Sequence, residues 1–255
     1  MTVLVGAHVP SQDPLSEAAA RAAEVVQIFL SNPQSWKQPN PRDDAGELRT
    51  AGVPIYVHAP YLINPVTENT RVRIPSRRIL QETCDAATEI GAAGVVVHGG
   101  QVTGGGAMTD AFPRWRKALT ELDSEVKVLI ENTAGGDNAV VRTVEGLGML
   151  WDEIGDLDVG FVLDTCHAWS GGERLEGLVE RVTAVTGAID LVHLNDSRDG
   201  FDSRRDRHAN LGDGEIPPES LVALVAEAGA PVVVETPGEG PDQRVDIEWI
   251  RARLS

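Results

Sequence analysis

Short apolar runs alternate with longer amphipathic runs along the whole chain. The short runs, such as residues 95–97 and 232–234, are continuously apolar, which is typical of strands buried on both faces of a parallel sheet. The longer runs follow helical spacing, most clearly where Ile79, Thr83 and Ala87 share one face. The pattern predicts eight strand–helix units, with strands at 2–7 and 25–30, later strands ending at 58, 98, 131, 164, 195 and 235, and the clearest helices at 16–24, 43–51 and 76–90.

From the third onward, each strand-like run leads to a side chain that can bind a metal ion. These side chains are His58, His98, Glu131, Asp164, His193 and Glu235. In a closed barrel the carboxyl ends of parallel strands meet at one face, whereas an open, doubly wound sheet spreads them along an edge. We therefore predict a single-domain (β/α)8 TIM barrel over residues 1–255, a usual length for this fold, with a metal site at the carboxyl ends of its strands.

Further metal-binding side chains follow two of these strands. His167 lies on the loop just beyond Asp164, and Asp206 and His208 form an Asp-x-His pair whose side chains point the same way in an extended chain. The candidates now include five imidazoles and four carboxylates, a mixture too rich in nitrogen for magnesium or calcium but suited to zinc. Nine ligands fit three ions with about three ligands each, which leaves every ion the open position of a catalytic site.

Three more residues with metal-binding side chains are expected to have other roles. Cys84 falls on the apolar stripe of the helix at 76–90 and is expected to pack in the core. Cys166 follows a strand end that Asp164 already occupies, so its thiol should point into the packing. His8, just past the first strand, is expected to contact a ligand or the substrate. The cysteines form no Cys-x-x-Cys motif, which favours a reducing cytoplasm.

The net charge of −17, from 22 basic and 39 acidic residues, on its face argues against a polyanionic partner. The arginines, however, form clusters over residues 71–78 and 198–207. Both clusters follow predicted strand ends, so we expect both on the face that holds the metals, although solvated surface charge is the alternative. No apolar run approaches the length of a membrane span, and the first residues lack a basic signal region, so we expect a cytoplasmic protein without a membrane partner.

Eight sequence blocks occur in order over essentially the whole chain. They are GAHV at 6–9, QIFLSNPQSW at 27–36, HAPYLIN at 58–64, ENTAG at 131–135, DTCH at 164–167, HLND at 193–196, DRHANLGDG at 206–214 and ETP at 235–237. The combination of the DRHANLGDG, DTCH and ENTAG blocks is highly specific. The chain thereby resembles the endonuclease IV family, the zinc-dependent apurinic/apyrimidinic endonucleases of base-excision repair that are also called deoxyribonuclease IV.

The resemblance implies a role for each candidate ligand. Glu131 would bridge two of three zinc ions and orient the attacking water. The other ligands would be His58 and His98 at the first site, Asp164, His193 and Glu235 at the second, and His167, Asp206 and His208 at the third. The implied reaction is hydrolysis of the phosphodiester 5′ to an abasic site in double-stranded DNA, which leaves a 3′-hydroxyl and a 5′-deoxyribose phosphate. We expect the enzyme to be a monomer.

Loops after the second and third strands resemble the minor-groove recognition loops of the family. Gln34, Trp36, Tyr61 and Leu62 would lie there, where an aromatic or apolar wedge can unstack a base step and hold the DNA bent. Ordinary packing over the barrel rim is the alternative for the two aromatic residues. On the loop after the seventh strand, the basic pair Arg204 and Arg205 would meet DNA phosphates.

The chain departs from the family pattern at two places. Gln34 stands about where the family commonly has an arginine, so a neutral side chain replaces one cation. His98-Gly99-Gly100 replaces the usual His-Pro-Gly, and the glycine-rich stretch that follows predicts a looser loop. Both departures bear on DNA affinity, and both leave the metal ligands in place.

Two other functions are compatible with parts of this pattern. A metal-dependent sugar isomerase or epimerase also binds divalent ions at the strand ends of a barrel, but with oxygen-rich ligands and one or two metals. His167, Asp206 and His208, the third set of ligands, therefore favour the nuclease. A non-catalytic zinc or damaged-DNA binding module is the remaining alternative, and the open position at each three-ligand site argues against it.

Overall fold

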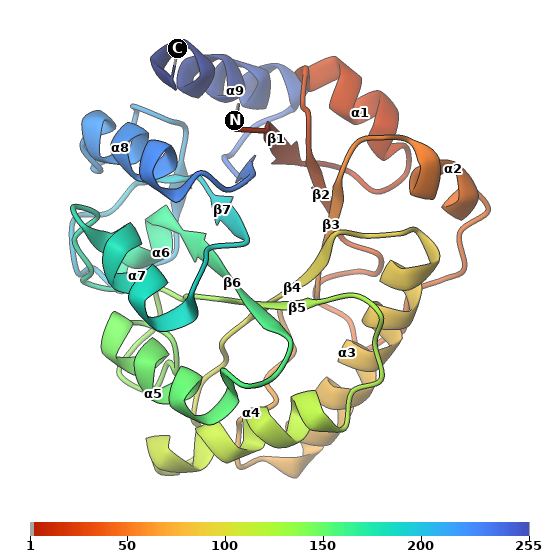
Figure 1. Ribbon diagram of the computed structural model, residues 1–255, viewed down its shortest axis with the longest axis vertical. Helices are drawn as coiled ribbons and strands as arrows, with labels where there is room; N and C mark the ends of the chain where they lie inside the picture. Colours follow the sequence, from red (N-terminus) through yellow and green to blue (C-terminus); the bar gives the residue numbers. More distant parts are fainter. Residues whose placement is uncertain (1–2, 255) are drawn as a thin grey trace.

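Eight parallel strands close into a barrel with helices around it in the computed structural model, which describes residues 3–254 (Figure 1). The strands follow one another in chain order, and the last pairs with the first. They are β1 (Val5–His8), β2 (Val26–Ile28), β3 (Ile55–His58), β4 (Gly94–His98), β5 (Val128–Glu131), β6 (Val159–Asp164), β7 (Leu191–His193) and β10 (Val232–Val234). The TIM-barrel prediction is confirmed, although Thr2, the predicted start of the first strand, lies outside the described residues.

The outer ring consists of helices that follow the strands. They are α1 (Pro14–Arg21), α2 (Ala45–Thr50), α3 (Thr70–Glu89), α4 (Ala111–Thr120), α5 (Val144–Ile154), α6 (Thr165–Ser170), α7 (Leu178–Thr186), α8 (Pro218–Ala228) and α9 (Gly240–Leu254), with one 3-10 turn, η1 (Met108–Asp110). Helix α1 begins earlier than predicted because Asp13 rather than Ser16 caps it: Oδ1 of Asp13 accepts a hydrogen bond from the Ser16 amide.

Helix α3 also begins earlier than the sequence pattern indicated. The helical spacing of the apolar residues predicts it from residue 76, and Pro75, just before, lacks an amide donor and usually breaks a helix interior. The structure places Pro75 inside the helix and the first turn at Thr70, where Asn69 accepts a hydrogen bond from the amide of Arg71. The cap at Asn69 satisfies an amide of the first turn, and the helix begins five residues before the proline.

Alternate residues of each strand point into the barrel. Seven inward-facing residues form a separate apolar cluster: Val25, Tyr56, Val96, Leu129, Val162, Leu191 and Val233. Two residues further along the chain, the same face carries Gln27, His58, His98, Glu131, Asp164, His193 and Glu235. The polar side chains therefore form the next layer of the barrel interior and rest on an apolar floor that excludes water.

A second, larger apolar cluster fills the space between the strands and the helices. Trp115 of α4 is fully buried in it, and its indole Nε1 donates a hydrogen bond to the carbonyl of Gly99 at 2.8 Å. This outer packing therefore fixes the chain immediately after His98, at the mouth of the barrel.

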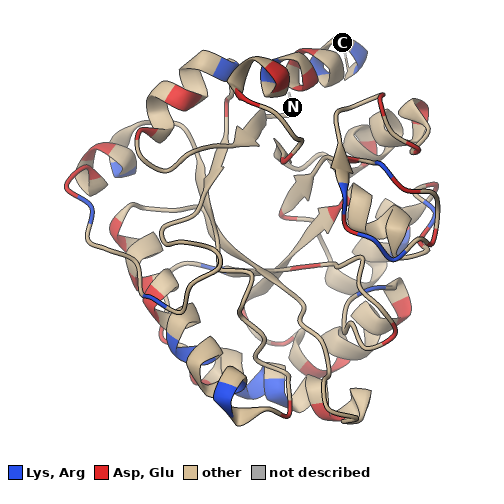
Figure 2. Cartoon of the chain, turned by 180° about the vertical axis from the view of Figure 1, so that it is seen from behind, with Lys and Arg blue, Asp and Glu red and all other residues tan. Residues whose placement is uncertain are grey.

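Charged residues lie on helices all around the ring (Figure 2). Acidic and basic positions both occur on these helices, and the loop that follows β7 carries basic residues interspersed with acidic ones (Figure 2). Among the described residues, no helix combines the length and apolar character needed to cross a membrane.

Candidate metal centre

The first group of ligands lies between strands β3, β4 and β5. Nε2 of His58 is 3.2 Å from Oε2 of Glu131, and Nε2 of His98 is 3.4 Å from the same oxygen. The ligand atoms of these three residues all lie within 4.8 Å of one another. His58 and Glu131 are fully buried and His98 is partly buried. This first set matches the first predicted site.

The second set joins Glu131 to Asp164, His193 and Glu235, again within 4.8 Å. Nδ1 of His193 lies 3.1 Å from Oε1 of Glu131 and 3.3 Å from Oε2 of Glu235. The two oxygens of Glu131 thus face different sets, Oε2 the first and Oε1 the second. A carboxylate in this arrangement is suited to bridge two cations, which is the role that the sequence resemblance implied.

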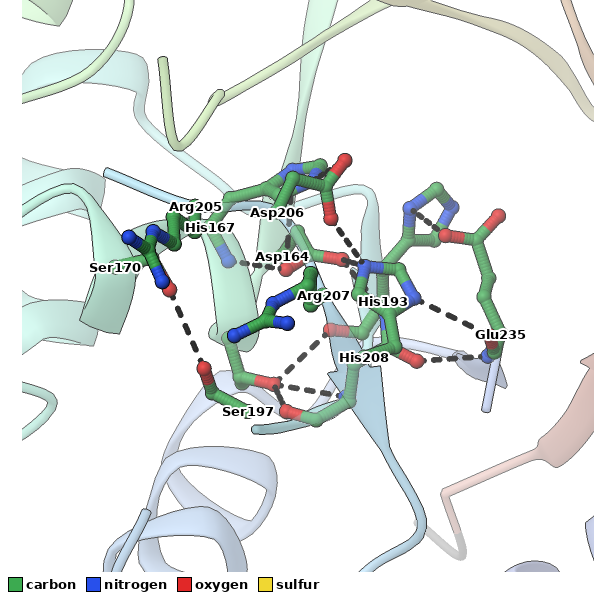
Figure 3. A network of polar contacts seen from close by, with 12 residues as sticks. Asp164, His167, Ser170, His193, Ser197, Arg205, Asp206, Arg207, His208 and Glu235 are labelled. Atoms are coloured by element: carbon green, nitrogen blue, oxygen red, sulfur yellow. Dashed lines mark hydrogen bonds and ion pairs between the residues drawn. The ribbon is translucent and has the colours of Figure 1, made fainter. Parts of the chain in front are cut away.

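The third set lies at the edge of the barrel mouth (Figure 3). Asp206 places Oδ2 3.2 Å from Nε2 of His167 and Oδ1 3.1 Å from Nε2 of His208. Asp164 completes a group with His167 and His208 and so connects the second and third sets. All nine predicted ligands therefore converge on one centre.

His167 was predicted on a loop, and the structure corrects this. The residue lies in the first turn of α6, where the carboxylate of Asp164 caps the helix by accepting the backbone N–H of His167 at 2.6 Å. Asp206 and His208 come from a second unpredicted feature, an antiparallel pair of two-residue strands, β8 (Asp196–Ser197) and β9 (His208–Ala209). The loop between these strands carries Asp206 to His167.

Three histidines use one ring nitrogen for the backbone and leave the other for the centre. Nδ1 of His58 lies 2.7 Å from the carbonyl oxygen of Ala59. Nδ1 of His167 lies 2.9 Å from that of Asn132, and Nδ1 of His208 lies 3.2 Å from that of Glu235. An Nδ1–H that donates to a carbonyl fixes the tautomer and leaves Nε2 with its lone pair. This is the usual arrangement of histidines that bind metals.

The donor chemistry of the centre fits zinc. Nε2 of His208 is buried and makes no well-aligned hydrogen bond among the described residues, and carboxylate oxygens of Asp206 and Asp164 face it at 3.1 and 3.9 Å. A buried lone pair without a donor is costly unless a cation binds it. Five imidazoles with four carboxylates are also the ligand mixture expected of zinc rather than of magnesium or calcium.

Burial and opposite charge compete over the protonation of these side chains. Burial would raise the pKa of Glu131, but neighbouring histidines, His193 first among them, hold that pKa well below its usual value. Burial would lower the pKa of His193, yet Glu235 and Glu131 raise it to about 9. The pKa of His208 is likewise raised to about 9, against burial, by the carboxylates beside it. Without metal, protons on these imidazoles balance the negative charge of the carboxylates. A bound cation would replace these protons.

Two asparagines and a glutamine that sequence reasoning passed over support the ligands. Asn132 accepts the amide N–H of Asp164 at 2.7 Å, and Asn195 donates to Oδ2 of Asp164 at 2.7 Å while accepting the amide N–H of Glu235. Both asparagines stand in blocks already noted, one residue after Glu131 and two after His193. Gln27 is buried in the same layer as the ligands.

Cys166 lies closer to the centre than expected. Its side chain is fully buried, as predicted, but its Sγ comes within 4.8 Å of the ligand atoms of Asp206 and His208. Burial raises the pKa of the Cys166 thiol to about 12, so the group keeps its proton. The predicted third set, His167, Asp206 and His208, is complete without this thiol.

Tyr61 covers the first set of ligands. Its ring is parallel to that of His98 at 5.7 Å between centroids and meets His58 edge-on at 5.4 Å, yet it remains 49% exposed. Leu62 beside it is half-buried, and the amide of Tyr61 donates to Pro33 of the preceding loop. Tyr61 is therefore placed both to pack on the centre and to meet a substrate.

The other residues predicted to meet DNA lie further from the ligands or are engaged by acidic groups. Gln34 and Trp36 are exposed on the loop after β2. Arg204 forms an ion pair with Asp137, and Arg205 is 3.5 Å from Asp199. Any phosphate that binds these arginines must compete with the aspartates.

The arginine cluster at residues 71–78 was expected at the metal face, and the structure corrects this for two of its members. Arg77 pairs with Glu121, just after α4, at 3.0 Å. Arg78 pairs with Glu82, one turn along α3, at 2.8 Å. Both pair within the outer ring of helices, although Arg78 also donates to the carbonyl of Trp36, on the loop after β2, at 3.4 Å.

The glycine-rich loop after β4 is held more firmly than its composition suggested. The amide of Gly99 donates to the carbonyl of Glu131, and the amides of Val140 and Val102 bond with the facing segments at 3.0 and 2.8 Å. A Cβ on Gly99 would lie 2.4 Å from Cγ2 of Val141. Val141 fills the space that a side chain at residue 99 would need, so this position of the loop requires glycine.

A cleft of about 1020 Å³ adjoins the centre. It is lined by the loops that follow β1, β2 and β10, and His8 and Phe29 form its border with the ligands. His8 also contacts Glu235, with Nδ1 3.2 Å from Oε1, in keeping with the expected contact to a ligand.

The comparisons with known proteins agree with this site. Residues 15–253 match the family described as Xylose isomerase-like TIM barrel. A protein named probable endonuclease 4 from Mycobacterium ulcerans (strain Agy99) is 58% identical over 253 residues, which are 99% of this chain and 100% of that relative. The chain belongs to the endonuclease IV family. Membership of this family, together with the clustered ligands, identifies the chain as a metal-dependent nuclease, a phosphodiester hydrolase of DNA repair.

Among the solved structures similar to this chain, one is an endonuclease IV and another shares only the fold. The crystal structure of endonuclease IV from Thermus thermophilus superposes with a TM-score of 0.84 at 28% identity and covers 98% of both chains. A D-tagatose 3-epimerase-like protein superposes with a TM-score of 0.82 at 21% identity, with 99% of this chain and 97% of that chain covered. The second likeness concerns the fold alone, so the barrel by itself does not distinguish nucleases of the endonuclease IV family from epimerases. The sequence identity to the endonuclease 4 relatives distinguishes them.

Proposed function

We propose that this chain hydrolyses the phosphodiester 5′ to abasic sites in double-stranded DNA, with three zinc ions, and leaves a 3′-hydroxyl and a 5′-deoxyribose phosphate. The observation that carries the proposal is the convergence of three ligand sets: Glu131 belongs to the first two, and Asp164 of the second also groups with His167 and His208 of the third. A shared carboxylate keeps neighbouring cations close enough to act on one phosphate.

Each set supplies the ligands of one zinc ion. The first ion would be held by His58, His98 and Glu131, the second by Glu131, Asp164, His193 and Glu235, and the third by His167, Asp206 and His208. When bound, such ions act as Lewis acids that lower the pKa of water and neutralise charge on a phosphate. Glu131 is the carboxylate best placed to orient the attacking water, because it lies at the centre of the sets.

The surroundings of the centre suit a nucleic acid. Tyr61 and Leu62 stand at the rim of the first set, where a wedge would hold the DNA bent and present the abasic sugar to the ligands. Gln34 and Trp36 are exposed on the loop after β2, whose residues 30–33 line the cleft. Arg204 and Arg205 would exchange their aspartate partners for DNA phosphates.

We also propose that the protein works as a monomer in the cytoplasm. One chain supplies all nine ligands, so the centre is complete without a partner subunit. Cys84 and Cys166 are buried free thiols, which fits a reducing compartment.

A cleavage assay on end-labelled duplexes tests the proposal. We expect the purified protein to cut a duplex with one abasic site, to leave the intact duplex uncut, and to lose activity with a chelator. The product should have a 3′-hydroxyl that a DNA polymerase extends directly. Products with a 3′-unsaturated sugar would point to a lyase instead of a hydrolase, and equal cutting of both duplexes would overturn the abasic-site specificity.

A further inference from the structure

Gln27 occupies on β2 the position that carries a metal ligand on six other strands. It follows the apolar floor residue Val25 by two positions, as Glu131 follows Leu129 and His193 follows Leu191. Its side chain is fully buried. An uncharged amide buried among carboxylates and imidazoles needs hydrogen-bond partners for both of its ends.

Both ends of the Gln27 amide meet ligands of the second set. Oε1 lies 2.9 Å from Nε2 of His193, and Nε2 donates to Oε1 of Glu235 at 2.6 Å. The second N–H of the amide faces Nδ1 of His8 at 2.9 Å. The orientation of the amide follows from these partners, because an amide oxygen turned toward the carboxylate of Glu235 would be repelled.

The contact with His193 decides which ring nitrogen is free for a metal. Oε1 of Gln27 can only accept, so Nε2 of His193 must carry a hydrogen, and in the neutral ring, the form that binds a metal, Nδ1 then keeps the lone pair. Nδ1 is the atom that faces Glu131 and Glu235. His193 thus uses the opposite nitrogen from His58, His167 and His208, whose Nδ1 atoms face backbone carbonyls. Among the described residues the ring of His193 bonds to side chains, and Gln27 supplies the acceptor that a carbonyl supplies elsewhere.

We propose that Gln27 is a positioning residue for the second metal position, one that fixes the tautomer of His193 and the orientation of Glu235 at once. The inference rests on the proposed function, since it assumes that the second set holds a zinc ion. Residues that orient metal ligands in this way typically change metal affinity by about 10- to 100-fold when replaced. We expect the effect on one of the three zinc ions, because Gln27 contacts ligands of the second set.

The test uses the zinc-loaded full chain and its Gln27→Met variant, which keeps the side-chain length and removes both polar ends. Competition with a chelator should show one zinc bound about 10- to 100-fold more weakly and the other two unchanged. The kcat for abasic DNA should fall while KM stays the same. Thr83→Val is the matched control, because Thr83 is also buried but bonds within α3, to Ile79; it should leave zinc affinity and kcat unchanged.

A second readout reports the tautomer directly. In nitrogen-15 NMR spectra of the zinc-loaded protein, we expect the Nε2–H of His193 as a slowly exchanging signal that Gln27→Met removes. Gln27→Glu keeps an oxygen acceptor at this place and should retain the signal, even though it loses the donor to Glu235. If Gln27→Met folds poorly, Gln27→Glu still tests the tautomer, and loss of the signal in that variant would overturn the inference.

The wild-type protein separates the two possible failures. A wild-type chain that binds three zinc ions and cleaves abasic DNA, with Gln27→Met equal to it in zinc affinity and in the His193 signal, would overturn the positioning role and leave the proposed function standing. A wild-type chain that binds no zinc would overturn the proposed function, and the inference with it.

Discussion

At the scale of single residues, the proposed metal centre depends on Glu131. Its two carboxylate oxygens face different ligand sets, and the surrounding histidines hold its pKa well below the usual value despite burial. The charge of this side chain, rather than its size, is therefore what the site requires. Six strand-end ligands could be predicted from the sequence because a charged side chain at the end of a buried strand is conspicuous. Gln27 could not, since an uncharged residue inside the run at 25–30 carries no such signal.

Replacing Glu131 by glutamine keeps the shape and removes the charge. We expect cleavage of abasic DNA to fall on the order of 10³-fold, comparable with the loss of a group that stabilises a transition state, while binding of the damaged duplex largely survives. Single-turnover cleavage and a binding assay on the same duplex measure the two effects. Glu227→Gln, at an exposed position on α8, is the control. Near-normal turnover in Glu131→Gln would place the chemistry elsewhere.

Tyr61 gives a second prediction at this scale. Its half-exposed ring stacks on His98, so Tyr61→Ala should weaken binding to abasic duplex by about 1–3 kcal/mol, the typical value of a stacking contact, and leave the zinc content intact. Tyr61→Phe keeps the ring and should keep the affinity. Titrations of labelled duplex together with metal analysis measure both. Unchanged affinity with a lower melting temperature would mean that Tyr61 merely packs over the rim.

At the scale of elements, the strands were predictable and the short additions at the barrel mouth were not. The continuous apolar runs and their polar ends indicated β3 to β6 to the last residue. Helix α6 has six residues and β8 and β9 have two each, too few to form a periodic pattern. Tertiary contacts stabilise them instead: Asp164 caps α6, and Trp169 of α6 donates to the carbonyl of Asp199 on the β8–β9 loop.

The β8–β9 loop carries the arginines that we expect to meet phosphates. Because each phosphate contact contributes about −0.9 to the slope of log affinity against log salt, Arg204→Ala with Arg205→Ala should make that slope shallower by about 1.8, twice this value. Binding to abasic duplex from low to moderate salt measures it. Arg77→Ala with Arg116→Ala, whose side chains pair with Glu121 and Asp156 among the outer helices, is the control and should not change the slope. A double variant of Arg204 and Arg205 with the wild-type slope would show that the aspartates keep these side chains from the DNA.

At the scale of the whole molecule, an acidic chain with a net charge of −17 is a nuclease. Four of the acidic groups lie in the metal centre, where bound cations would offset them. The remaining acidic positions are spread over the outer helices (Figure 2). The composition alone argued against a DNA partner, but association depends on the potential at the docking face rather than on the net charge, so the acidic total does not exclude one.

Removal of metal should make folding sensitive to pH. The pKa values of His193 and His208 are raised to about 9, above the ordinary value of 6.5, so their protonation stabilises the metal-free fold fully below pH 6.5 and progressively less as the pH rises to 9. We therefore expect the melting temperature of chelator-treated protein to fall between pH 6.5 and 9. In the zinc-loaded protein these imidazoles hold metal in place of protons, so the fall should be absent and the melting temperature higher. A metal-free protein that becomes more stable over this range would contradict the charge balance described for the centre.

The central claim, one catalytic centre built from three zinc ions, is tested most directly by restoring zinc to metal-free protein in known amounts. We expect cleavage of an abasic duplex to remain low until the ligand sets are filled and to reach its full rate at about three equivalents of zinc per chain. Three ions is the number that nine ligands suit. Full activity at one equivalent, or recovery with manganese and not with zinc, would contradict it.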